Sequence, residues 1–193
     1  MTHPPTLEQA FRQLKQGYFE NALESFTDYL LVDAEEAKAY QGRAMASFQL
    51  NQWASAVSDF QKAKELDPAD LENWVGLAMS LAMENKIYEA VDVFEELLSR
   101  HPTFVRGHVQ LGLLYYRLGV ITKGHQQMDW ALACRPPLAE RRLIEQSKKE
   151  QVALDKKRYY RPDFEALRET DRTNLFSHWM EKIKNFLKER RGH

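Results

Sequence analysis

The sequence predicts an all-α protein built from helix pairs that recur every 34 residues. Leu, Ala, Glu, Lys and Gln dominate the composition and favour helices, whereas β-branched residues are few. Three columns of residues keep register at this spacing, and self-similarity at a period of roughly 20–50 residues indicates a repeat architecture. The columns are Pro68, Pro102 and Pro136; Ala22, Ala56, Ala90 and Gly124; and Phe26, Phe60, Phe94 and Met128.

The first repeat is expected to cover about residues 3–36. Its first helix should begin near Thr6 and end at Gly17, a residue that readily adopts the left-handed conformation after a helix. Between them, apolar residues follow one another at intervals of three and four, which is the pattern of an amphipathic helix. That first helix carries Leu7, Ala10, Phe11 and Leu14, and the second carries Phe19, Ala22, Leu23, Phe26 and Leu30.

The next three repeats are expected at 37–70, 71–104 and 105–137. One column should form the turn between the two helices of every pair, because it contains only Gly and Asn, the residues that tolerate a positive φ most easily. Another column of small residues on the first helices should let paired helices approach closely. The turn column is Gly17, Asn51, Asn85 and Gly119, and the small-residue column is Ala10, Ala44, Ala78 and Gly112.

Beyond Pro137 the repeat register ends. Residues 138–158 are expected to form one charged helix that covers the last repeat, followed by a basic linker at 159–170. Residues 171–193 are then expected to form an amphipathic tail helix with basic residues outside its apolar face. The interaction face of this tail is predicted to be Phe176, Trp179, Met180, Ile183, Phe186 and Leu187.

The central stretch of the chain resembles the tetratricopeptide repeat, a helix–turn–helix unit. The resemblance lies in the order and spacing of Trp74, Leu77, Ala78, Leu81, Ala90, Phe94 and Pro102. It implies a right-handed superhelical solenoid of four repeats with a C-terminal capping helix and an extra amphipathic helix. It also implies that the first helices line a concave groove in which another protein binds.

Transferring the family's inward positions to this chain by register gives a groove that is rich in methionine and aromatic residues. Such residues suggest a surface that repacks around varied ligands. The alternative is that the same side chains only pack between neighbouring first helices. The predicted groove residues are Phe11, Leu14, Gln41, Met45, Phe48, Val75, Met79, Met83, Val109, Leu113, Tyr116 and Arg117.

Some members of the family clamp the C-terminal carboxylate of heat-shock proteins with Lys and Asn side chains. The matching positions here are Leu7, Phe11, Gly42, Glu72 and Gly76. None of them supplies a donor side chain, and Glu72 would repel a carboxylate. The resemblance therefore does not extend to this mode of binding.

No set of residues indicates catalysis, a metal or a cofactor. Cys134 is the single cysteine, which suits a reducing compartment, and no histidine stands at a metal-ligand spacing from it or from another histidine. No nucleotide-binding glycine-rich loop occurs. We expect a non-enzymatic cytoplasmic protein, since no signal peptide and no apolar run long enough to span a membrane are present.

Charge is distributed unevenly along the chain. Residues 1–137 contain 12 basic and 18 acidic residues, and residues 138–193 contain 15 basic and 10 acidic. An acidic array makes nucleic acid an unlikely partner. The sequence indicates an adaptor or assembly chaperone that holds an apolar helix or peptide of another protein. The alternative is a peripheral membrane assembly factor that is anchored by the tail. Instead of binding a membrane, the tail could pack on the capping helix or fold back into the groove.

Overall fold

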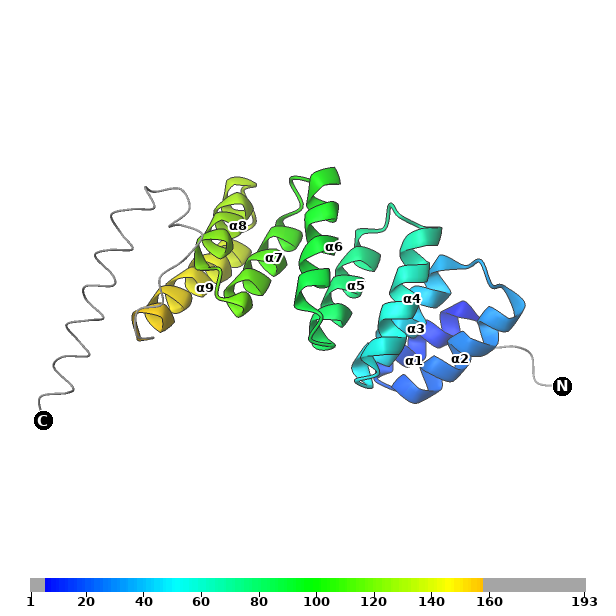
Figure 1. Ribbon diagram of the computed structural model, residues 1–193. Coiled ribbons are helices and arrows are strands. Elements are labelled where there is room, and N and C mark those ends of the chain that lie inside the picture. The colour runs from blue at the N-terminus through cyan, green and yellow to red at the C-terminus, as the bar shows by residue number, and fades with distance from the viewer. Residues whose placement is uncertain (1–5, 158–193) are drawn as a thin grey trace, which may run out of the picture.

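The computed structural model describes residues 6–157, which form four helix pairs and one further helix in an elongated stack (Figure 1). No strand occurs in this range, so the prediction of an all-α repeat solenoid is confirmed. The linker and the tail helix predicted at 159–170 and 171–193 lie outside the described residues. The pairs are α1 (Leu7–Gln16) with α2 (Phe19–Val32), α3 (Ala37–Gln49) with α4 (Trp53–Leu66), α5 (Leu71–Met83) with α6 (Ile87–Arg100), and α7 (Val105–Leu118) with α8 (Ile121–Ala133), followed by α9 (Leu138–Lys157).

The turn inside each pair has the same backbone geometry. The φ angles of Gly17, Asn51, Asn85 and Gly119 are 83°, 59°, 65° and 78°, so all four adopt the left-handed conformation that the sequence predicts. The residue after each of them donates its backbone N–H to a carbonyl of the preceding helix, as Gln52 does to Ser47 at 2.9 Å. This bond satisfies a carbonyl at the end of the first helix. Each second helix therefore leaves its partner in the same direction.

A phenylalanine ring joins each of the first two repeats to the next one. The rings of Phe26 on α2 and Phe60 on α4 are almost fully buried. They lie directly against Gly42 on α3 and Gly76 on α5, where an added Cβ would stand 2.2 Å and 2.3 Å from ring carbons. Only glycine allows the backbone of the next first helix to lie this close to the ring.

Buried polar groups also connect the second repeat to the third. The Gln41 amide on α3 donates to Asp70 Oδ2 at 2.9 Å and to Asn73 Oδ1 at 2.8 Å. Asn73 is 1% exposed, and its own amide donates to the carbonyls of Ala63 and Asp67. Because a buried polar group without a partner is costly, this network favours one register between α3 and α5.

The helix α9 covers the end of the array. Its Ile144 is 1% exposed and packs in a cluster with Tyr116, Met128 and Ala131 of the fourth pair. The charged helix expected to cover the last repeat therefore lies against α7 and α8.

The contact between Phe60 and Gly76 predicts that replacing this helical glycine by alanine lowers stability, whereas the same change in a helix usually raises it. In a helix, alanine is normally favoured over glycine by about 1 kcal/mol. Gly76→Ala should nevertheless destabilise the protein, by roughly 1–3 kcal/mol, because its Cβ would overlap the ring. The urea midpoint at constant m-value measures this. As a control, Ala54→Gly at an exposed position of α4 should lower the midpoint in the ordinary way. A higher midpoint for Gly76→Ala would contradict the close contact.

Candidate protein-binding groove

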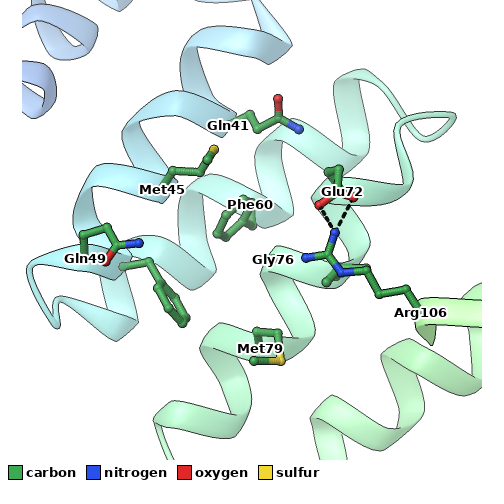
Figure 2. A pocket seen from close by; sticks show the side chains of 10 residues that line it. Gln41, Met45, Gln49, Phe60, Glu72, Gly76, Met79 and Arg106 are labelled. Atoms are coloured by element: carbon green, nitrogen blue, oxygen red, sulfur yellow. Dashed lines mark hydrogen bonds and ion pairs between the residues drawn. The ribbon is translucent and has the colours of Figure 1, made fainter. Parts of the chain in front are cut away.

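An open cavity of about 220 Å³ lies on the face formed by the first helices, between α3 and α5 (Figure 2). Met45 and Phe48 of α3 and Val75 and Met79 of α5 line it, with Phe60 of α4 between the two helices. We call this cavity and its lining the inner groove. Its other lining residues are Gln41, Gln49, Glu72, Gly76 and Arg106.

A second depression of about 350 Å³ continues the groove toward the N-terminus. It shares Met45 and Gln49 with the inner groove and extends to α1 and the start of α2. Its further lining residues are Phe11, Leu14, Lys15 and Phe19. The two depressions therefore form one trough across α1, α3 and α5.

The repeat period explains why apolar side chains gather on this face. Phe11, Met45, Met79 and Leu113 occupy equivalent positions in the four first helices, so stacking the helices aligns them in a row. Met45 and Leu113 are 44% and 37% exposed, and Met83, one turn beyond Met79, is 47% exposed. Exposure of large apolar groups along one face is typical of a binding surface.

One ion pair crosses the rim of the inner groove. Arg106 of α7 reaches toward α5, where its Nη1 donates to both carboxylate oxygens of Glu72 at 2.6 and 2.8 Å (Figure 2). The two residues stand at equivalent positions of consecutive repeats. Both side chains are about half exposed, so the pair contributes little to stability. It adds a charged, hydrogen-bonding edge to an apolar floor.

The structure brings seven of the predicted groove residues together in the two depressions. Met83 and Leu113 are exposed but line neither depression, and Arg117 donates to the Ala82 carbonyl at 3.4 Å. The predicted set lacks seven lining residues, namely Lys15, Phe19, Gln49, Phe60, Glu72, Gly76 and Arg106. Glu72 and Arg106 were detectable as opposite charges one repeat apart. The seven predicted residues that line the depressions are Phe11, Leu14, Gln41, Met45, Phe48, Val75 and Met79.

Tyr116 and Val109, two further residues of the predicted groove, line neither depression. Tyr116 is 7% exposed, and its ring packs on Gly124 of α8. Val109 packs in the same cluster, beside α9. The Tyr116 hydroxyl and His125 Nδ1 lie 2.8 Å apart and form a hydrogen bond. Burial raises the pKa of Tyr116 to about 12, so the hydroxyl stays protonated and can donate.

Within residues 6–157, no group of three or more His, Cys, Asp or Glu side chains could hold a metal ion. No helix in the same range has the length and apolarity that crossing a bilayer requires. The predicted tail residues Phe176, Trp179, Met180, Ile183, Phe186 and Leu187 lie outside this range.

Residues 37–70 and 72–103 each match a model of the tetratricopeptide repeat. The chain carries tetratricopeptide repeats. Sperm-associated antigen 1 of Mus musculus is 36% identical over 86 residues, which is 45% of this chain and 9% of that protein. The peroxisomal targeting signal receptor of Candida albicans is 30% identical over 84 residues, which is 44% of this chain and 14% of that protein. The chain thus spans about a tenth of the length of these curated relatives.

Solved structures share the fold. A MamA fragment from Desulfovibrio magneticus RS-1 superposes with a TM-score of 0.66 at 20% identity, covering 91% of this chain and 92% of that one. The second tetratricopeptide-repeat domain of human RPAP3, in complex with an HSP70 peptide, gives a TM-score of 0.53 at 23% identity, covering 55% and 89%. At these identities the likeness concerns the fold alone.

A tryptophan of the third helix pair has a polar role that a histidine takes over in the fourth pair. Trp74 Nε1 donates to the Pro68 carbonyl at 3.0 Å. One repeat later, His108 Nε2 lies 2.9 Å from the Pro102 carbonyl. A carbonyl only accepts, so Nε2 of His108 donates to it. His108 thus replaces the tryptophan of the preceding repeat both in packing and in its hydrogen bond.

The contact between α7, α8 and α9 predicts a pH dependence. Burial lowers the pKa of His125, and Lys148 on α9 lowers it further, whereas Asp129 and Asp155 oppose the shift. Below pH about 6.5 the unfolded chain therefore binds more protons at this site than the folded one. The free energy of unfolding should fall as the pH drops through that range.

Urea midpoints measured between pH 7.5 and 5.5 test this, with His125→Gln as the comparison. The variant should lose less stability on acidification than the wild type, because the other histidines contribute equally to both. Equal losses in the two proteins would contradict the assignment.

Proposed function

We propose that the chain is a non-catalytic adaptor or assembly chaperone whose trough holds an apolar segment of another protein. The observation that supports this is the row of exposed apolar side chains on the first helices. Two open depressions lie along this row. Arrays of this repeat stack into solenoids with extended concave binding surfaces. An apolar groove across successive helices suits a helix or an extended peptide.

The size of the inner groove favours a peptide over a metabolite. Pockets for small molecules have volumes of roughly 300–1,000 Å³ and bury most of the ligand. The inner groove holds about 220 Å³ and is open. It therefore fits one or two apolar side chains that project from a longer segment. Flexible methionines on both sides, Met45 and Met79, could adapt to different side chains.

The length of the apolar row on the first helices, of which the trough is part, favours a segment of several turns. Packed helices lie about 8–10 Å apart, so the four first helices extend over roughly 30 Å. A helix of about 20 residues has this length. The RPAP3 domain, which shares the fold, also binds a peptide, although its HSP70 peptide is shorter than such a segment. The membrane-anchored alternative depends on residues 171–193, which lie outside the described residues.

Selection of a random displayed peptide library on the immobilised full chain tests the proposal. We expect enriched peptides to carry apolar residues at helical or alternating spacing. Met45→Asp should weaken the binding of these peptides at least tenfold, because Met45 lines both depressions and a carboxylate there would have to be desolvated.

A matched control separates the trough from the opposite face. Tyr88 on α6 is 75% exposed and lines neither depression, so Tyr88→Asp should leave peptide affinity unchanged. Circular dichroism should show that both variants stay helical. Equal binding by Met45→Asp and the wild type would overturn the proposal.

A further inference from the structure

The trough leaves large apolar side chains in contact with water, and the chain itself contains a segment that could cover them. Met45, Met83 and Leu113 are 44%, 47% and 37% exposed on the first-helix face. Residues 171–193, outside the described residues, are expected from their sequence to have one apolar face. We propose that residues 171–193 occupy the trough of their own chain and compete with the partner that the proposed function requires.

The area of the available surfaces favours the trough over α9. The segment contains seven large apolar residues at helical spacing between Leu175 and Leu187. On α9, Leu143 and Leu154 are 65% and 51% exposed and stand three turns apart on the same side. Two leucines cannot cover seven large side chains. The first-helix face offers the two depressions of the trough and an apolar row across four helices.

Charge also favours the repeats over α9. Residues 6–104 contain 17 acidic and 8 basic residues, a net charge of −9. The segment 171–193 contains 6 basic and 3 acidic residues, and α9 contains 6 basic and 4 acidic. The segment is therefore attracted by the first three repeats and weakly repelled by α9. The trough itself does not oppose this approach, since Glu72 already neutralises Arg106 at its rim.

The connection is long enough to allow the contact within one chain. The last described residue is Lys157 at the end of α9, and 13 residues, 158–170, separate it from the segment. An extended chain of that length spans up to about 45 Å. Ile144 of α9 packs in the same cluster as Tyr116 of α7, so α9 follows α7 in the row of first helices. From α9 to α3 there are three steps along this row, namely to α7, to α5 and to α3. At about 10 Å per position this distance is roughly 30 Å.

Occupancy by its own segment would make the trough selective. A tether of this kind gives a local concentration of about 1 mM. If the docked segment dissociates with a local Kd of about 0.1 mM, apparent affinity for a partner falls about tenfold. Weak ligands would then be excluded, and strong ones would displace the segment.

Photocrosslinking in the full chain tests the contact, with Trp179 replaced by p-benzoylphenylalanine. We expect crosslinks within a single chain to 7–16, 37–49 or 71–83, identified by mass spectrometry of peptides. The substitution Met45→Asp should reduce these crosslinks, and Leu143→Asp should not. Crosslinks confined to 138–157, crosslinks only between two copies, or no crosslinks would each overturn the proposal. Circular dichroism checks that every variant is folded.

Affinity for a library-selected peptide separates this inference from the proposed function. Trp179→Asp should bind that peptide about tenfold more tightly than the wild type, and Leu143→Asp should match the wild type. If the selected peptide binds in the trough with equal affinity to all three proteins, the docking of residues 171–193 is wrong and the proposed function stands. If Met45→Asp has no effect on peptide binding, the proposed function fails as well.

Discussion

The packing of a phenylalanine ring on the next repeat's glycine is the contact on which the rest of the structure depends. Phe26 on Gly42 and Phe60 on Gly76 set how closely one helix pair approaches the following one. That approach fixes the distance between consecutive first helices, and therefore the width of the trough between α3 and α5. A side chain at either glycine would push the helices apart. The binding surface is thus a consequence of how the repeats stack, and the stacking depends on a few small residues.

The periodicity of the sequence was sufficient to predict the helices and their turns. All four turn residues adopt the expected left-handed conformation, because the same local requirement recurs in every pair. The groove was predicted less well, since inward positions transferred from a family assume that each first helix faces open space. Tyr116 breaks that assumption, because it is buried in the cluster that α8 and α9 form with α7 at the end of the array. The 34-residue period cannot predict a contact made by α9, because this helix lies outside the repeats.

The sequence alone also did not predict which polar residues pair with each other at positions that are apolar in another repeat. Arg43 pairs with Asp59 through two hydrogen bonds of 2.8 and 2.7 Å inside the second repeat. The third repeat has Leu77 and Val93 at the same two positions. Either an ion pair or an apolar pair fills this space between paired helices, so the column shows no single residue type. Such a pair is recognised only when both partners are placed in space, as with Glu72 and Arg106 at the groove rim.

The central claim is that the methionine-lined trough on the first helices is where a partner binds. Methyl NMR of the full chain labelled at its methionines tests it, using a library-selected peptide as ligand. Met45 and Met79 line the trough, whereas Met128 is fully buried between α7, α8 and α9. The account predicts that the methyl signals of Met45 and Met79 shift on titration and that the signal of Met128 stays in place. A peptide that binds without moving the signal of Met45 or Met79 would contradict it.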